Sequence, residues 1–137
     1  MSDVNDWNRR IIDEFRANDG QVSGQFAGFP LLLLHSTGAR SGQARVHPVA
    51  YRRVGDGFAV FASKAGAPTN PDWYHNLVAH PRTRVEVGSD TLDVVARVAE
   101  GEERDRIWAD QMRDYPNFAE YQSKTTRRIP VVILDPA

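Results

Sequence analysis

Residues 29–62 read F-P-L-L-L-L-H-S-T-G-A-R-S-G-Q-A-R-V-H-P-V-A-Y-R-R-V-G-D-G-F-A-V-F-A, and this stretch decides the fold class. It opens with an apolar run between turn signals, which predicts a strand buried on both faces. An alternating segment follows, and then Gly55-Asp56-Gly57, which is a hairpin signal before a second apolar segment. The predicted strands are residues 29–35, 43–53 and 58–62.

The rest of the chain adds another hairpin and several helices. Further strands are expected at residues 84–87, 91–99 and 129–134, and helices at 4–17, 70–79, 102–114 and 118–123. Asp3 is a candidate cap for the first helix, and Asn70 for the second, with Pro71 at its first helical position. Because hairpins outnumber strand–helix–strand crossovers, we predict an α+β fold, in which helices pack on an antiparallel sheet or barrel of six strands. A doubly wound nucleotide fold is disfavoured.

The composition is that of one soluble domain. The chain has 137 residues, 41% of them hydrophobic and 26% charged, so a single domain over residues 1–137 is expected. Its formal net charge of −1 argues against a nucleic-acid binder, which is usually basic. The absence of cysteine excludes disulfides and thiolate chemistry. No apolar run approaches the roughly 20 residues that cross a bilayer, and the polar N-terminus does not resemble a signal peptide, so a cytoplasmic protein is expected.

The charge is unevenly distributed along the chain. Between residues 20 and 71 the only acid is Asp56, whereas the bases are Arg40, Arg45, Arg52, Arg53 and Lys64. A cationic segment in a neutral protein indicates a small anionic ligand rather than a polyanion. The alternative is that these side chains lie on solvated strand faces.

The glycine-rich segment S-T-G-A-R-S-G, residues 36–42, is the first candidate site. A turn of this kind exposes backbone N–H groups, its hydroxyls add donors, and Arg40 offers a guanidinium fork, all of which suit a phosphate or a carboxylate. An ordinary β-turn with a solvated Arg40 explains the same pattern. No P-loop or dinucleotide-binding fingerprint occurs. No metal is expected, because His75 and His80, five residues apart, lack the spacing of two ligands on one helical face.

Two further segments carry chemistry. In A-S-K-A-G, residues 62–66, small side chains let a flat ring approach the backbone and Lys64 supplies a cation, although a plain surface loop fits equally well. Trp73, at helical spacing from Leu77, is more often a core residue than a ligand contact. In residues 115–124, Phe118, Tyr121 and Lys124 follow one another at one-turn spacing, which is typical of a pocket wall or of a hydrophobic clamp on the sheet.

Taken together, four segments resemble the deazaflavin-dependent nitroreductase family, small actinobacterial proteins that use the cofactor F420. They are L-L-L-H-S-T-G-A-R-S-G-Q-A-R, A-S-K-A-G-A-P-T-N-P-D-W-Y-H-N-L, H-P-R-T-R-V-E-V and Y-P-N-F-A-E-Y-Q-S-K-T-T-R-R-I-P-V-V-I-L, and the likeness covers residues 29–136. The resemblance implies a split β-barrel like that of FMN-binding proteins. It also implies an F420-dependent reductase that transfers a hydride from reduced F420 to a quinone, nitroaromatic or similar small acceptor.

The resemblance implies site residues as well. The expected cofactor contacts are Arg40, Ser41 and Gly42 on the anionic tail and phosphate, Arg45 in the same cationic stretch, Ser63, Lys64 and Ala65 beside the ring or its phosphate, and Asn70, Pro71 and Trp73 as the remaining wall. Tyr121 matches a family tyrosine that lines the acceptor pocket. Phe118 and Lys124 stand where a related nitroreductase has tyrosines, so the resemblance does not extend nitroimidazole reduction to this chain.

The cofactor's chemistry sets what the protein has to supply. A deazaflavin carries carbon where a flavin has its central nitrogen, so two-electron hydride transfer is favoured over radical steps. The acceptor is then expected to stack over that carbon at roughly 3–3.5 Å. Tyr121 is the first candidate to orient the acceptor or donate a proton, and Ser63 is the second.

Other functions and partners stay open at this point. The alternatives are an FMN- or heme-binding protein of the same barrel class and a noncatalytic F420 carrier. The apolar stripe of the first helix, which includes Trp7, Ile11 and Phe15, favours packing on the core or on a second copy in a homodimer. With a lipid quinone as acceptor, the same helix is expected to allow loose association with the inner face of the cell membrane.

Overall fold

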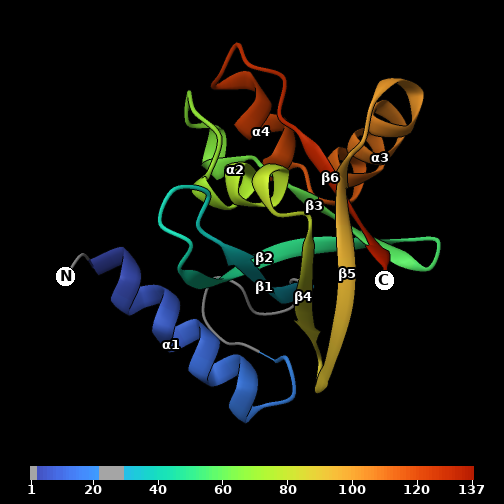
Figure 1. Ribbon diagram of the computed structural model, residues 1–137. Coiled ribbons are helices and arrows are strands. Elements are labelled where there is room, and N and C mark those ends of the chain that lie inside the picture. Colours follow the sequence, from blue (N-terminus) through green and yellow to red (C-terminus); the bar gives the residue numbers. More distant parts are fainter. Residues whose placement is uncertain (1–2, 22–29) are drawn as a thin grey trace.

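The computed structural model describes residues 3–21 and 30–137 of the chain. Within these ranges, six strands form one closed antiparallel barrel in the order β1-β2-β3-β6-β5-β4 (Figure 1). The strands are β1 (Leu31–Thr37), β2 (Ala44–Val54), β3 (Gly57–Phe61), β4 (Arg82–Val87), β5 (Asp90–Val98) and β6 (Val131–Pro136). The helices are α1 (Asp3–Ala17), α2 (Asp72–Ala79), α3 (Gly101–Asp114) and α4 (Asn117–Ser123), with the short 3-10 helix η2 (Lys64–Gly66). The predicted α+β barrel is confirmed.

Alternate side chains of the strands fill two separate cores. Phe58 and Val60 of β3 point into the barrel, where they join an interior cluster with Leu32 and Leu34. α2 covers one end of the barrel, and its Trp73 belongs to the same cluster at 7% exposure. The burial of residues 31–34 confirms the predicted two-sided burial of the described part of β1.

The second core lies on the outer face of β3 and β6. Phe61 and Ile133 point outward there and are covered by Trp108 of α3 and Phe118 of α4. The rings of Phe61 and Phe118 meet edge to face at 5.6 Å between centroids. α3 and α4 are therefore attached to the barrel by packing, on the side where β3 pairs with β6 (Figure 1).

α1 lies along the outside of the barrel beside β2 and the turn between β4 and β5 (Figure 1). Its Phe15 is 1% exposed, and Arg16 pairs with Glu86 of β4 at 2.7 Å. Asp3 is the first residue of the helix rather than the cap before it. The side chain of Trp7 lies outside the described part, so its expected packing stays a prediction. None of the described helices is long and apolar enough to cross a bilayer.

Two predicted boundaries differ from the structure for identifiable reasons. α2 begins at Asp72 and not at residue 70, because Pro71 has an extended backbone and the side-chain oxygen of Asn70 accepts a hydrogen bond from Arg127 instead of capping the helix. β6 begins at Val131 and not at residue 129, because the N–H of Ile129 donates to Gln122 Oε1 and Pro130 has no N–H. The other described elements differ from the predicted ranges by one or two residues at their ends.

Candidate functional site

The β1–β2 loop, residues 38–43, is a turn held by its own backbone. The N–H of Gly38 donates to the carbonyl of Gln43 at 2.8 Å, and the N–H of Gly42 donates to the carbonyl of Gly38 at 2.9 Å. Gly42 has a φ of 71°, in the left-handed region that glycine adopts without a steric penalty. The Ser41 hydroxyl accepts a hydrogen bond from the N–H of Gln43. The loop therefore has a defined shape, with Arg40 and Ser41 exposed on it.

A buried amide on α2 fixes this loop to the end of the barrel. Asn76, 7% exposed, accepts a hydrogen bond at Oδ1 from the N–H of Ala39 at 3.0 Å. Its Nδ2 donates to the Ser36 hydroxyl at 3.2 Å. Both ends of the amide are satisfied, as is usual for a buried polar side chain. α2 thus sets the distance between its own first turn and the loop.

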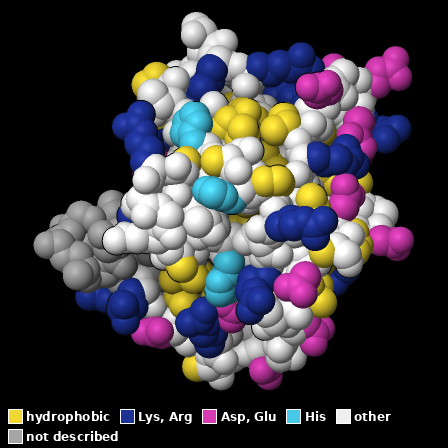
Figure 2. Space-filling view, viewed as in Figure 1, with side chains coloured by type: hydrophobic (Ala, Val, Ile, Leu, Met, Phe, Trp, Pro, Cys, Tyr) yellow, Lys and Arg dark blue, Asp and Glu magenta, His cyan; other side chains and the backbone are white. Residues whose placement is uncertain are grey.

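The loop, β2 and α2 enclose a cleft of about 670 Å³. Its walls carry two guanidiniums, two imidazoles and one carboxylate. The lining residues are Gly38, Ala39, Arg40, Ser41, Arg45, His47, Asp72, His75 and Asn76. In the view of Figure 2, lysine and arginine side chains lie on both sides of a row of histidines.

The donors of this cleft suit a phosphate or a carboxylate. Among the described residues, neither Arg40 nor Arg45 pairs with a carboxylate, whereas arginines such as Arg16 and Arg97 do. The backbone N–H groups of Arg40 and Ser41 make no hydrogen bond within the described part of the chain. Guanidinium forks and free N–H groups of a glycine-rich turn are the donors that bind phosphate oxygens. These donors are compatible with the anion site expected at residues 36–42, which stays a prediction.

Arg45 also borders a second cleft, of about 560 Å³, where β1 and β4 diverge. The β1–β4 ladder pairs Leu33 with Glu86 and Leu34 with Val85. Beyond it, Arg82 and Arg84 of β4 line the second cleft. Asp93 also lines this cleft and pairs with Arg84 at 3.9 Å, so the second cleft carries charges of both signs, and Arg45 borders both clefts.

His47 lies in the wall of the first cleft, and no motif in the sequence pointed to it. Its Nδ1 is buried and has no hydrogen-bond partner within the described residues. Burial lowers the pKa of His47 from its ordinary value, nearby Arg45 lowers it further, and Asp72 opposes the shift. The imidazole is therefore neutral at pH 7, and the positive charge of the cleft comes from its arginines.

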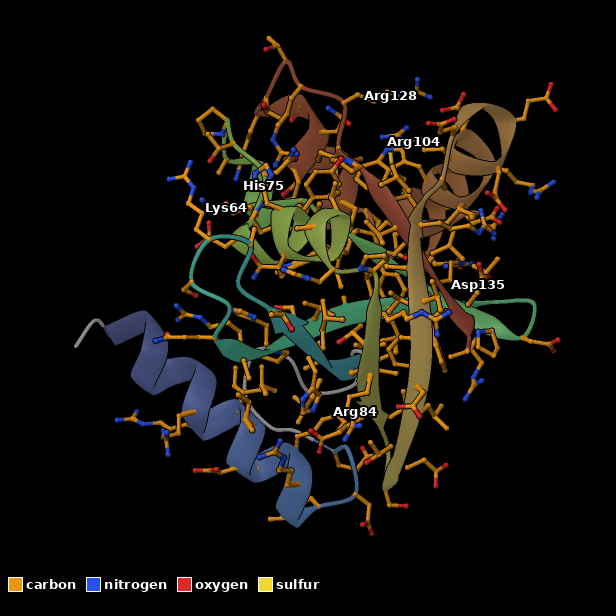
Figure 3. All side chains as sticks on the ribbon, in the orientation of Figure 1. Lys64, His75, Arg84, Arg104, Arg128 and Asp135 are labelled. Carbon is orange, nitrogen blue, oxygen red and sulfur yellow. The ribbon has the colours of Figure 1, made fainter. Side chains whose placement is uncertain are left out.

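A second predicted wall is the loop from Ala62 to Asn70. Lys64 has a φ of 47°, and its exposed side chain donates from Nζ to Thr69 Oγ1 at 3.3 Å. Lys64 and His75 lie on the same side of the molecule as the β1–β2 loop (Figure 3). Ser63 is partly buried, and the side chain of Ala65 lies outside the described part. Pro71 is buried before α2, and Trp73 lies in the barrel interior, in line with the core interpretation of its spacing.

The predicted acceptor residues lie on or just after α4, against the Lys64 loop. A Cβ placed on Gly66 would lie 2.7 Å from the carbonyl oxygen of Tyr121 and 2.9 Å from Lys124 Cβ. Tyr121 is partly buried, and its hydroxyl accepts a hydrogen bond from Asn117 Nδ2 at 3.1 Å. Lys124 is exposed, whereas Phe118 is 5% exposed within the outer core.

The structure thus groups the predicted residues into two sets. Arg40, Ser41 and Arg45 line the first cleft, and the Lys64 loop packs on α4 with Tyr121 and Lys124. None of the described pockets includes residues of both sets. Arg127 donates hydrogen bonds to the Lys64 loop. It lies in the segment 115–134 that carries the family resemblance, but no pattern in the sequence predicted a role for it.

Solved structures similar to this chain share its barrel. A structure described as an F420-H2 dependent reductase is 43% identical, with a TM-score of 0.70 over 77% of this chain and 94% of that chain. One described as a domain-swapped dimer is 40% identical, with a TM-score of 0.73 over 96% of both chains. The heme storage protein HutZ of Vibrio cholerae, 16% identical with a TM-score of 0.61 over 95% of this chain and 90% of its own, shows the fold alone.

Sequence comparison gives the family. The F420H(2)-dependent quinone reductase Rv1261c of Mycobacterium tuberculosis is 39% identical over 124 residues, which cover 88% of this chain and 83% of that protein. The family model of the F420H(2)-dependent quinone reductases matches residues 7–136. The chain with the cationic cleft and the Lys64 loop is therefore a member of the F420H(2)-dependent quinone reductase family.

Proposed function

We propose that this protein is an F420H2-dependent oxidoreductase that reduces a quinone or a similar small acceptor. The observation that carries the proposal is the cleft beside the β1–β2 loop. There, two arginines without a carboxylate partner among the described residues meet backbone N–H groups that make no hydrogen bond within the same part of the chain. F420 carries a phosphate and glutamate carboxylates, and these are the groups that such a donor set binds. Family membership identifies which anionic ligand is to be tested first.

The proposed cofactor contacts follow the two sets of residues in the structure. Arg40, Ser41, Gly42 and Arg45 bind the anionic part, Ser63, Lys64 and Ala65 lie beside the ring, and Asn70, Pro71 and Trp73 complete the wall. Trp73 is in the barrel core, so its share is to support this wall from behind. Neutral His47 adds a hydrogen-bonding group to the same cleft without adding charge.

When bound, reduced F420 supplies a hydride, which a quinone takes up together with one proton to form a hydroquinone. Tyr121 is the proposed proton donor. Its oxygen accepts a hydrogen bond from Asn117 Nδ2, which leaves its own O–H proton free for an acceptor. Ser63 is the second candidate, because its hydroxyl makes no hydrogen bond within the described residues. A Tyr121→Phe enzyme with unchanged turnover on a quinone would remove Tyr121 from this role.

The acceptor side of the site is proposed to consist of Phe118, Tyr121 and Lys124. Phe118 packs edge to face on the Tyr121 ring at 5.3 Å between centroids, so its contribution is to hold that ring in place. Exposed Lys124 adds a cation next to the acceptor. Quinones are the proposed first acceptor class and nitroaromatics the second.

Cofactor binding and turnover test the proposal separately. The protein is titrated with F420 and then with FMN, and binding is followed by fluorescence. We expect F420 to bind more tightly, and an F420 affinity no better than that of FMN would favour the flavin-binding alternative. Menadione is then added to the protein with reduced F420. Oxidation of the cofactor supports the reductase, and its absence favours a carrier.

We also propose that the protein forms a homodimer, since one similar chain is described as a domain-swapped dimer. Light scattering on the purified protein tests this, and a monomeric mass at all concentrations would contradict it. A cytoplasmic location with loose membrane contact through α1 is the matching proposal for a lipid quinone acceptor. Flotation with anionic vesicles, compared with and without residues 1–20, tests the membrane contact.

A further inference from the structure

One guanidinium is bonded to four groups of the loop that follows β3. The acceptors of Arg127 are the carbonyl oxygens of Ala62 (3.0 Å), Ser63 (2.8 Å) and Ala67 (2.9 Å) and the Oδ1 of Asn70 (2.8 Å). Burial lowers the pKa of Arg127, but a guanidinium stays charged at neutral pH, so these are charge-assisted hydrogen bonds. Arg127 has no ion pair within the described residues. Its donors are thus directed to the loop.

The loop needs such an external support. Its only regular element is the three-residue η2, with hydrogen bonds from Gly66 N–H to Ser63 and from Ala67 N–H to Lys64. Lys64 has a φ of 47°, a left-handed conformation that is sterically unfavourable for a non-glycine residue. Strained backbone of this kind persists where the surroundings determine it. The guanidinium holds the backbone on both sides of Lys64.

The chain around Arg127 is also attached to α4. Gln122 donates from Nε2 to the carbonyl of Arg127 at 2.8 Å and accepts at Oε1 from the N–H of Ile129 at 3.2 Å. Gly66 lies directly against the carbonyl of Tyr121. Arg127 therefore lies between the helix that carries Tyr121 and the loop that carries Lys64.

We infer that Arg127 is a positioning residue: it holds Ser63 and Lys64 where they meet the cofactor and fixes their loop relative to Tyr121. The ligand in this inference is the F420 of the proposed function. The order that Arg127 imposes on the loop, by contrast, is a property of the chain alone. The two can be measured separately.

The adjacent Arg128 provides a matched control. It is exposed, pairs with Asp105 at the start of α3, and makes no hydrogen bond to the Lys64 loop within the described residues. Arg128 lies toward α3, on the other side of α4 from Lys64 (Figure 3). Replacing Arg127 or Arg128 with methionine removes one positive charge in each case, and the two positions are adjacent in the chain.

The test compares Arg127→Met, Arg127→Lys and Arg128→Met. Hydrogen–deuterium exchange of residues 62–70 measures the order of the loop without any ligand. F420 fluorescence gives the dissociation constant of F420, at a temperature well below that at which each variant unfolds. We expect Arg127→Met to raise loop exchange and the F420 dissociation constant at least tenfold. Arg127→Lys is expected to fall between it and the wild type, because an ammonium cannot reach all four acceptors. Arg128→Met should match the wild type in both.

Each outcome decides the inference. A folded Arg127→Met protein with wild-type exchange in residues 62–70 would overturn it, as would a lower unfolding temperature with an unchanged F420 dissociation constant. If Arg127→Met does not fold, Arg127→Lys decides in the same way. A wild-type protein that binds no F420 would refute the proposed function, and loop exchange would still decide the role of Arg127.

Discussion

The backbone N–H of Ala39 and the side-chain Oδ1 of Asn76 are joined by a 3.0 Å hydrogen bond, although 37 residues separate them in the chain. The glycine-rich loop is thus positioned by α2 and not only by the strands that flank it. Since α2 also carries Asp72 and His75 into the cleft, two walls of the site are coupled through one amide.

Replacing Asn76 with alanine should loosen the β1–β2 loop and weaken the proposed anion site. The change leaves the Ala39 N–H and the Ser36 hydroxyl without their partner, and a buried unsatisfied group costs about 1–3 kcal/mol. We expect the free energy of unfolding to fall by that amount and inorganic phosphate to bind more weakly. Denaturant unfolding and phosphate titration measure the two effects. Asn18→Ala, at an exposed amide bonded to Glu14, is the control, and equal losses in both variants would contradict the prediction.

Neutralising the cleft arginines should weaken binding of the anionic ligand. A hydrogen bond to a charged group contributes about 1.5–3 kcal/mol, so Arg40→Gln and Arg45→Gln should each raise the F420 dissociation constant about tenfold or more. Raising the salt concentration should reduce the difference in the F420 dissociation constant between each variant and the wild type, because salt screens the charges. Arg106→Gln, at an exposed arginine of α3 that lines neither cleft, should bind like the wild type. A similar loss in Arg106→Gln would show a general charge effect instead.

Gly66→Ala should separate the Lys64 loop from α4. Gly66 has a φ of 83°, and an added Cβ would lie 2.7 Å from the Tyr121 carbonyl oxygen. Gly55→Ala is the matched control, because Gly55 has a φ of 57° but open space around its Cβ position. Gly55→Ala should destabilise the protein by about 1–2 kcal/mol through backbone strain alone. Gly66→Ala should destabilise it more and reduce turnover, and equal effects by thermal unfolding would contradict this.

The attachment of α1 should weaken in acid. Hydrogen bonds from Arg16 lower the pKa of Glu86, desolvation opposes the shift, and a hydrogen bond with His35 lowers the pKa further. A carboxyl group with a lowered pKa in the folded state stabilises the protein above its ordinary pKa of 4.5, and this contribution is lost as the pH falls through the folded pKa. Glu86→Gln should therefore lower the free energy of unfolding by about 1 kcal/mol at pH 7. In acid the free energy of unfolding of Glu86→Gln should approach that of the wild type. A difference between the two proteins that does not change with pH would contradict the prediction.

His47 should titrate below its ordinary pKa of 6.5, because burial and Arg45 both disfavour its cation. For a base whose pKa is lowered by folding, protonation favours the unfolded state. Stability therefore falls as the pH drops below 6.5 toward the folded pKa. NMR titration of the His47 ring in wild-type protein gives the midpoint, with His47→Gln for assignment. Bound phosphate should raise that midpoint, and a midpoint above 6.5 without ligand would contradict the prediction.

Local patterns in the sequence predicted the parts of the fold that depend on near neighbours. The run at residues 31–34 is buried on both sides, and Gly55 and Gly88 lie at hairpin turns with positive φ. The start of α2 was predicted wrongly because it depends on Arg127, which lies 57 residues after Asn70 in the chain. No local pattern carries that contact.

The candidate site divides in the same way. The glycines and Arg40 of the β1–β2 loop predict an anion site from local sequence, because consecutive residues form the turn that would bind the anion. His47 and Asn76 belong to it only because β2 and α2 meet the loop in the folded chain. Phe118 shows the opposite limit: its spacing fits a pocket wall and a core residue equally, and the structure places it in the outer core. The cofactor itself was predicted from the family resemblance and not from any single residue.

β3 contributes Phe58 and Val60 to the barrel interior, and Ala59 and Phe61 to the layer beneath α3 and α4. β3 supports both the barrel interior and the layer beneath α3 and α4. If either layer unfolds, an apolar face of β3 becomes exposed and the other layer loses its support. The cleft at the barrel end and the α4 helix on its flank are therefore expected to belong to one cooperative unit. By mass action, a ligand that binds in the cleft should raise the melting temperature of the whole molecule. One calorimetric transition is then enough to rank candidate ligands, including those that produce no optical signal.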